Sequence, residues 1–341
     1  MKNKNNYSKI LPEIARQFSL GEIKEFKLLE DGLVNLSFSV GAEEGKFILQ
    51  RLNPIWDKRV IEDYCAVERY LRTNGLHVPV LLNSRTNGSY YELNGHIWRA
   101  FEYISHDPVQ EPTPELAYEA GKTLGKFHRL MGESNFKPTF KLPGFHDTPK
   151  ILNKLGEAFA NPKNRVKSGQ ATEEFEFIRN NMKKHRLPEY GPKIIIHGDP
   201  KLSNFLFKDG RATSLLDLDT MMEASPLIDL GDALRSWCRK KPSTSEYMPE
   251  IFEAAMKGYD EESNIHYCYQ GVMSAMGLLT LELAARYLAD YFEENYFAFK
   301  SKKYKTRAEQ NLARTRRYLE YYGDFIGNFR KFHIEPYQPG N

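Results

Sequence analysis

The first hundred residues alternate between hydrophobic and polar positions with the two-residue period of β-strands. Between residues 34 and 40, polar residues separate four apolar ones, namely Val34, Leu36, Phe38 and Val40. This pattern predicts a strand with one buried face. The segment GAEEGK then predicts a turn, and KFILQRL predicts the returning antiparallel strand because it is short, apolar and bounded by turn residues.

A helix and a hairpin follow these strands. Residues 60–71 carry one apolar stripe at helical spacing, which stops at Asn74-Gly75. The segment YYELNGHIWRAFEYI predicts two strands around the turn Asn94-Gly95. The first ~105 residues therefore predict strands, one helix and further strands.

A cluster of prolines separates this part from a longer, mainly helical one. Pro108, Pro112 and Pro114 mark the break, and an apolar stripe at helical spacing covers residues 116–131. A helix at 172–187 and the short strands of KIIIHGD and FLFKDGRATSLLDLD follow, before helices to about residue 332. We therefore expect an amino-terminal lobe at 1–105 and a carboxy-terminal lobe at 106–341.

Composition and charge exclude several classes of protein. The 341 residues are 41% hydrophobic and 27% charged, which is typical of a globular protein and excludes a disordered or collagen-like chain. A net charge of +3 is too small for a dedicated nucleic-acid binder. Three cysteines without a C-x-x-C pair, a polar amino terminus and an apolar stretch of only residues 271–281 favour a cytoplasmic protein without a membrane segment.

The segment IIIHGDPKLSNFLF carries the candidate chemistry. Asp199 and Asn204 lie between a buried apolar run and a second short strand, and Asp217 ends another apolar run. Transfer of a phosphoryl group needs a carboxylate that orients the attacking hydroxyl and oxygen ligands for Mg²⁺. These three residues supply both, although a capped turn or a loop-end carboxylate is the alternative interpretation.

The order H-x-D, four residues, N and then D resembles the catalytic and metal loops of the protein-kinase-like fold. The H-G-D form is similar to the aminoglycoside phosphotransferase and choline kinase superfamily. This resemblance implies that Asp199 is the catalytic base, that Asn204 and Asp217 bind Mg²⁺, and that His197 braces the loop. It also implies an α+β fold, with a small antiparallel sheet lobe, a larger mainly helical lobe and ATP between them.

The sequence leaves two alternative roles for each of two further residues in these loops. Lys201 follows Asp199 by two residues, so its charge can neutralise the moving phosphoryl group, or it is a solvated loop lysine. Asp219 is the second acid of D-x-D, so it is either an additional metal ligand or a hydrogen-bonded structural carboxylate.

The nucleotide side of the amino-terminal lobe has weaker signals. Gly32 allows a close backbone approach to the phosphates, or it is a plain turn residue. The returning strand offers Gln50 and Arg51 on opposite faces, and we prefer Arg51 as the phosphate contact because of its charge. By helical phase its carboxylate partner is Glu68 rather than Glu62, although a surface Glu is the alternative for either.

Three other sets of residues complete the resemblance. Backbone groups of Glu102 and Ile104 are the expected partners of adenine, at the hinge between the lobes. Asp229 and Asp232 in PLIDLGDALRSW look like the helix-opening acids that brace the metal loop in this superfamily, but acids at a helix start are also good caps, and we favour that structural role. Trp237 on the same predicted helix is expected to be a core residue.

The resemblance narrows towards N-acetylhexosamine 1-kinases. The segments that carry it are GLVNLSFSV with FILQRLN, HGDPKLSNFLF, LLDLDTMMEASPLIDLGDALRSW, and the pair RYLADYFEENYF and NLARTRR. The resemblance implies that Arg314, with Arg316 as a second candidate, binds the sugar, whose anomeric hydroxyl would bond Asp199. Helical phase favours Arg316 instead, and both arginines can be solvated.

We therefore expect an ATP- and Mg²⁺-dependent kinase of a small-molecule sugar substrate, with the anomeric hydroxyl of an N-acetylhexosamine as the acceptor. One alternative is a kinase of another small molecule, such as an amino alcohol, homoserine or an aminoglycoside. A polycationic aminoglycoside ranks lowest because residues 300–317 are strongly basic. The other alternative is a catalytically silent nucleotide-binding protein.

Overall fold

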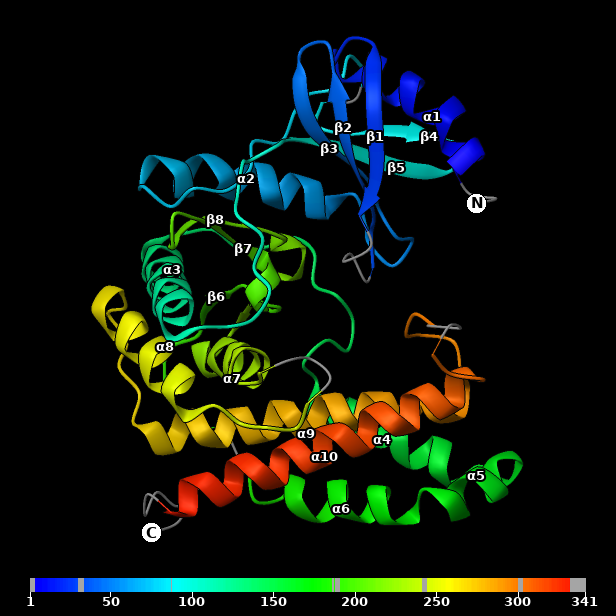
Figure 1. Cartoon of the computed structure of the whole chain (residues 1–341), viewed down its shortest axis with the longest axis vertical. Coiled ribbons are helices and arrows are strands. Elements are labelled where there is room, and N and C mark those ends of the chain that lie inside the picture. The colour runs from blue at the N-terminus through cyan, green and yellow to red at the C-terminus, as the bar shows by residue number, and fades with distance from the viewer. Residues whose placement is uncertain are drawn as a thin grey trace.

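The amino-terminal part of the chain forms a five-stranded antiparallel sheet, at the top of Figure 1. The computed structural model describes residues 4–29, 34–86, 88–185, 187, 191–240, 244–299 and 303–331. The spatial order of the strands is β1 (Ile23–Leu29), β2 (Leu36–Ala42), β3 (Gly45–Arg51), β5 (His96–Glu102) and β4 (Tyr91–Leu93). The register aligns Ser37 with Gln50 and Gln50 with Arg99, so these three side chains share one face of the sheet.

The other face of the sheet is covered by α1 (Lys4–Gln17), a helix that we did not predict. Leu11, Ile14 and Phe18 pack there against Phe38 and Leu49. Because successive strand residues point to opposite faces, burial of Leu49 under α1 leaves Gln50 facing the rest of the protein. The helix therefore decides which side of the sheet can face a nucleotide.

The helix α2 (Arg59–Thr73) carries the predicted apolar stripe and ends at the predicted stop, with Asn74 as its C-cap. Its buried residues belong to the same hydrophobic cluster as the carboxy-terminal helices, rather than to the cluster between α1 and the sheet. The core therefore does not divide at residue 105, although the chain does leave the sheet at Glu102. The boundary between lobes stays a prediction.

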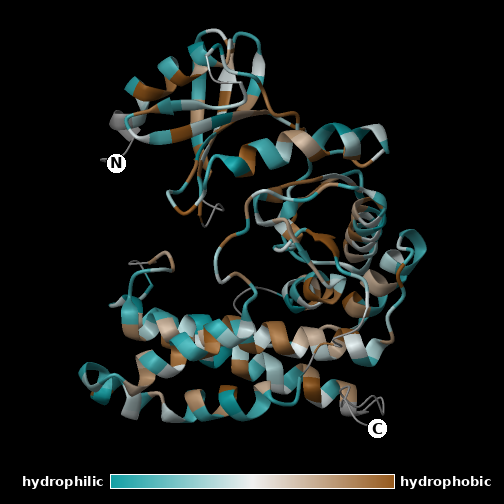
Figure 2. Ribbon diagram, turned by 180° about the vertical axis from the view of Figure 1, so that it is seen from behind, coloured by the Kyte–Doolittle hydropathy of each residue, from teal (hydrophilic) through white to brown (hydrophobic). Residues whose placement is uncertain are grey.

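The carboxy-terminal part is mainly helical, which confirms the α+β expectation. Its helices are α3 (Pro114–Glu133), α4 (Thr148–Ala160), α5 (Arg165–Gln170), α6 (Thr172–Met182), α7 (Pro226–Trp237), α8 (Pro249–Glu262), α9 (Tyr269–Glu293) and α10 (Arg307–Lys331). Figure 1 places α9, α10, α4 and α6 in a helical layer at the base, opposite the sheet. Hydrophilic and hydrophobic positions alternate along these helices in Figure 2, as expected for amphipathic helices around a core.

Two short hairpin-like sheets lie between these layers. The strand β6 (Ile194–Ile196) pairs with β9 (Met222–Ala224), and β7 (Phe205–Lys208) pairs with β8 (Arg211–Leu215) through the predicted turn Asp209-Gly210. The 3₁₀ turns η2 (Leu202–Asn204) and η3 (Leu218–Thr220) follow β6 and β8. A third, η1 (Pro162–Asn164), lies among the helices of the base.

One helix in the described part of the chain, α9, has the length and apolar composition of a membrane span. Within its most apolar 18-residue window, 83% of the residues are buried in the protein. The helix continues beyond the apolar stretch of residues 271–281, and its acids there are buried with partners: Glu282 accepts hydrogen bonds from His146 and Thr148, and Asp290 accepts one from Asn311. Its apolar character is therefore accounted for by the core.

Candidate active site

The loop after β6 carries His197, Gly198 and Asp199, and its backbone requires the glycine. Gly198 has φ of 88°, and a Cβ atom there would lie 2.5 Å from the carbonyl oxygen of Thr220. A side chain would therefore be excluded both by conformation and by space. The tight approach brings the segment around Asp217 beside the segment around Asp199.

Asp229, in the first turn of α7, fastens this loop. Its carboxylate accepts hydrogen bonds from the backbone N–H groups of His197 and Gly198, each at 2.7 Å, and from His128 Nε2 at 2.9 Å. Although burial raises the pKa of Asp229, the hydrogen bond and charge of His128 bring it below the ordinary value. Asp229 is therefore a structural acid that braces the loop, and it is not the cap of α7, whose N-cap is Ser225.

His197 is completely buried and bonded on both ring nitrogens. Its Nε2 donates to the Leu216 carbonyl at 2.8 Å, and its Nδ1 accepts from the Asp199 N–H at 3.2 Å. These partners select the neutral tautomer with the proton on Nε2. His197 therefore braces the loop, as predicted.

Trp237 also holds the loop. It is 1% exposed and packs edge-on against Phe205, which confirms the core assignment. Its indole N–H donates to the carbonyl of Pro200 at 2.9 Å. The core side chain thus fixes the backbone next to Asp199, a contact that helical spacing alone does not predict.

The four polar residues predicted for this site come together. Lys201 Nζ lies 2.7 Å from Asp199 Oδ2 and 3.9 Å from Asp217 Oδ2. Asn204 Nδ2 donates to the Asp199 carbonyl at 2.8 Å, so the amide oxygen is the atom left to bind a cation. Although burial lowers the pKa of Lys201, the charges of Asp199 and Asp217 raise it overall, so the ammonium stays protonated.

Asp217 has φ of 63° and ψ of 56°, a left-handed conformation that a non-glycine residue adopts only where its surroundings hold it. Desolvation by the surrounding protein and the charge of Asp219 raise the pKa of Asp217 above the ordinary value, although 39% of its side chain is exposed. A nearby cation would stabilise the ionised form of this carboxyl group. Among the described residues no group of three His, Cys, Asp or Glu side chains could hold a metal ion. Mg²⁺ needs only one or two carboxylates when it also binds phosphates, so Asn204 and Asp217 fit it.

Asp219 is bound on both carboxylate oxygens by protein side chains, which corrects its assignment as a metal ligand. Arg99 Nη1 lies 2.7 Å from Oδ1 and Arg99 Nη2 lies 2.6 Å from Oδ2. Asn35 Nδ2 donates to Oδ2 at 3.1 Å. Of the two roles predicted for Asp219, the ion pair with Arg99 favours the hydrogen-bonded structural carboxylate.

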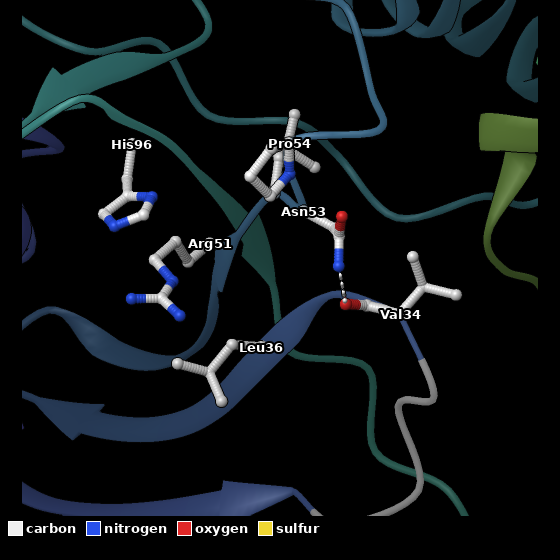
Figure 3. Close-up of a pocket in the computed structure, with 7 residues that line it drawn as sticks. Val34, Leu36, Arg51, Asn53, Pro54 and His96 are labelled. Carbon is white, nitrogen blue, oxygen red and sulfur yellow. Dashed lines mark hydrogen bonds between the residues drawn. The ribbon is translucent and has the colours of Figure 1, made fainter. Parts of the chain in front are cut away.

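The strand β3 places Gln50, rather than Arg51, on the face toward the carboxy-terminal part. Gln50 Oε1 accepts from Arg99 Nε at 2.8 Å, and its Nε2 donates to Ser37 at 2.9 Å. Arg51 points to the opposite face, where it lies with Leu36 and His96 beside a small pocket of about 60 Å³ (Figure 3). This register corrects the choice of Arg51 as the phosphate contact.

The other residues predicted for the nucleotide side have different neighbours. Glu68 accepts from the backbone N–H of Leu81 at 3.2 Å, so it is not paired with β3, and Glu62 is exposed. Glu102 forms an ion pair with Arg72 at 3.0 Å. At the hinge, the Ile104 carbonyl bonds His106 Nδ1 at 2.8 Å. Gly32 lies outside the described residues.

The two candidate arginines of α10 lie on different sides of the helix. Arg314 lies over the ring of Tyr287 at 5.2 Å from its centre, and Tyr287 is 5.7 Å from the ring of Tyr318. Arg316 Nε is 2.6 Å from Glu174 on α6, and its side chain is 55% exposed. Arg314 therefore packs against aromatic rings while Arg316 is exposed and paired, which is the reverse of the order that helical phase predicts, and binding of the sugar by either arginine stays a prediction.

The rings near Arg314 are linked to an acid of α7. Arg235 Nε lies 2.9 Å from Asp232 Oδ1, and Arg235 Nη1 is 3.5 Å from the Tyr318 hydroxyl. The charges of Asp232 and Asp199 raise the pKa of Arg235 although burial lowers it. Asp232 Oδ2 is buried and has no hydrogen-bond partner among the described residues. This free acceptor is suited to a bound ligand.

Comparisons with known proteins agree with this geometry. A profile described as "Phosphotransferase enzyme family" matches residues 25–263. The chain belongs to this phosphotransferase family. Curated relatives include homoserine kinases of Gluconobacter oxydans, 22% identical over 71% of this chain and 75% of that one, and of Phenylobacterium zucineum, 24% identical over 67% and 68%.

Solved structures with the same fold include amicoumacin kinase hAmiN, determined with AMP-PNP and Ca²⁺, at a TM-score of 0.67 and 17% identity over 92% of each chain. A microcompartment-associated aminopropanol kinase has a TM-score of 0.61 at 14% identity, over 93% of this chain and 98% of that one. These similarities confirm the kinase-like fold. They do not identify the acceptor molecule, because sequence identities of 14–17% support similarity of fold alone.

Sequence reasoning missed two residues beside the phosphotransferase site. Arg99 had a signal, since it is a lone charge within the apolar strand IWRAF, and a buried charge needs a partner. No sequence pattern indicates His146, because its contacts are with residues that are distant in the chain. His146 Nε2 donates to the Gly198 carbonyl at 2.8 Å and Nδ1 lies 3.0 Å from Glu282.

Proposed function

We propose that this phosphotransferase is an ATP- and Mg²⁺-dependent kinase of the anomeric hydroxyl of an N-acetylhexosamine. The observation that carries the sugar assignment is the group of aromatic and arginine side chains, Tyr287, Tyr318 and Arg314, that Arg235 links to Asp232 on α7. Ring faces pack against the C–H face of a sugar, and guanidinium groups donate to its hydroxyls. The free oxygen of Asp232 would accept a hydroxyl or acetamido N–H group.

The reaction would be a single in-line transfer. The acceptor oxygen forms a bond to the γ-phosphorus while the bond from that phosphorus to the β–γ bridging oxygen breaks, and ADP leaves. Asp199 would orient the hydroxyl and take its proton. Lys201, which bridges the carboxylates of Asp199 and Asp217, would place positive charge beside the moving group.

Asn204 and Asp217 would hold Mg²⁺, which neutralises the charge of the ATP phosphates when it is bound. Adenine would bond backbone groups of Glu102 and Ile104 at the hinge, and Gln50 would be the β3 residue nearest the phosphates. The double hydrogen bond of His197 and Gly198 to Asp229 supports this mechanism, because it fixes the loop before substrate binds.

A second candidate acceptor is homoserine. It is favoured by the homoserine kinases among the curated relatives, at 20–24% identity. The guanidinium of Arg314 or Arg235 would then bind the amino-acid carboxylate. A polycationic aminoglycoside fits less well, because these arginines would repel it. A cytoplasmic location follows from the same proposal, since ATP and small metabolites are its substrates.

The test is an acceptor panel with ATP and Mg²⁺: N-acetylglucosamine, N-acetylgalactosamine, homoserine, aminopropanol and an aminoglycoside. We expect ADP release with the N-acetylhexosamines, and phosphorus NMR should show coupling to the anomeric proton. A phosphate ester at another sugar position would refute the anomeric assignment. Turnover of homoserine alone would replace the sugar by the second candidate while retaining the kinase.

A further inference from the structure

On the face of β3 toward the metal loop, the end of the strand near Asp219 carries no cation, and Lys46 on the same face lies four residues earlier, over the ring of Tyr103. Gln50 occupies this end of the strand, and the charged Arg51 lies on the opposite face (Figure 3). The positive charge comes from the neighbouring strand, since Arg99 of β5 is the direct cross-strand partner of Gln50. The guanidinium of Arg99 therefore lies next to Gln50 on this face, where it is bonded to Gln50 and Asp219.

Arg99 connects three strands to the carboxy-terminal part. Its guanidinium is only 2% exposed and makes a two-pronged ion pair with Asp219, 120 residues away in the chain. Its Nε donates to Gln50, which in turn donates to Ser37 on β2. Asn35 joins from the start of β2 by donating to Asp219. The sheet is thereby attached to the loop that carries the metal ligand.

A buried ion pair of this kind adds little net stability, because desolvation of both charges offsets their attraction. Its value lies in geometry, since the planar guanidinium matches the carboxylate in one orientation only. Asp219 follows Asp217 by two residues, through the turn η3, and Asp217 is in the left-handed conformation. An anchored Asp219 therefore fixes the end of a strained segment whose start is the metal-binding carboxylate.

We propose that Arg99 is a positioning residue of the metal site, which acts through Asp219 to present Asp217 to Mg²⁺. A role through Asp219, rather than as a direct phosphate contact, is favoured because the Arg99 side chain is 2% exposed and four of its five N–H groups are bonded to Gln50 and Asp219. The inference rests on the proposed function, in that it needs a Mg²⁺-nucleotide complex at Asn204 and Asp217. Residues outside the direct ligand set commonly change metal affinity by about 10–100-fold.

The experiment measures the Mg²⁺ dependence of AMP-PNP binding by titration calorimetry. Arg99→Gln should raise the Mg²⁺ concentration for half-maximal binding by about 10–100-fold. The matched control is Arg51→Gln, which removes the same charge from the opposite face of the sheet and should leave the Mg²⁺ dependence unchanged. An unchanged Mg²⁺ dependence in Arg99→Gln, with normal AMP-PNP binding by the wild type, would overturn this inference and leave the proposed function standing.

Two double variants separate positioning from folding. Arg99→Gln with Asp219→Asn leaves no unpaired buried charge, so it should fold and still require the higher Mg²⁺ concentration. Arg99→Gln with Gln50→Lys returns a cation to β3 within reach of Asp219, and it should recover most of the lost Mg²⁺ affinity. A lower melting temperature with wild-type Mg²⁺ dependence in the first double variant would show a structural role only. Failure of the wild type to bind Mg²⁺ with AMP-PNP would overturn the proposed function itself, and this inference with it.

Discussion

Replacement of Asp229 by asparagine tests whether the catalytic loop is held by one buried carboxylate. Asp229→Asn keeps the shape of the side chain but replaces one acceptor oxygen by an NH₂ donor. One backbone N–H, of His197 or Gly198, would then face a donor at a position where it now has a 2.7 Å hydrogen bond. The variant loses a charge-assisted hydrogen bond, about 1.5–3 kcal/mol, and buries an unsatisfied donor, about 1–3 kcal/mol.

The combined loss should lower the free energy of unfolding by about 2.5–6 kcal/mol. For a chain of 341 residues, an unfolding entropy of about 2.1 cal/mol/K per residue gives about 0.7 kcal/mol/K in total. The melting temperature should therefore fall by about 4–9 °C. Scanning calorimetry measures this shift, and kcat should fall as well because Asp199 loses its fixed backbone.

The matched control is Asp209→Asn, at an exposed left-handed turn position that asparagine tolerates. It should change stability by less than about 0.5 kcal/mol. Acid provides a second check: the pKa of Asp229 lies below its ordinary value, so its stabilisation is complete above about pH 4 and is lost as the pH falls through the folded-state pKa. A shift below about 1 °C at neutral pH, with kcat unchanged, would refute the brace.

Three further predictions concern the chemistry. Asp199→Asn should retain AMP-PNP binding and lose about 10²–10⁴ in kcat; near-normal turnover would remove Asp199 from the mechanism. Arg314→Gln should raise the KM for the acceptor while leaving the KM for ATP unchanged, whereas Arg316→Gln should change neither, because Arg316 is paired with a carboxylate on α6; equal effects would contradict the assignment. Burial lowers the pKa of His146, but Glu282 raises it above 6.5 overall, so its stabilisation is complete below about pH 6.5 and lost as the pH rises through the folded-state value. His146→Gln should remove that alkaline decline from the pH dependence of the melting temperature, and an identical decline in the variant would contradict it.

Local patterns predicted the parts of the structure that depend on neighbouring residues. The alternation around Phe38, the Asn94-Gly95 turn and the stripe of α2 all appear as expected, because periodicity and turn chemistry act over a few residues. The helix α1 was missed, since its polar composition hides a short apolar face. The sequence pattern does not predict α4 either, since only Leu155 is fully buried there.

The residues of the catalytic loops were also predictable, because their spacing keeps Asp199, Asn204 and Asp217 at the ends of short strands whatever surrounds them. Only the tertiary structure decided which neighbours they have. The face of Gln50 and Arg51 depends on strand register under α1, and a shift of one residue reverses it. Arg99, the ion-pair partner of Asp219, lies 120 residues away in the chain, and no local sequence pattern links its strand to the loop of Asp219. A buried charge must find its counter-ion in space, and the sequence order does not specify where that counter-ion is.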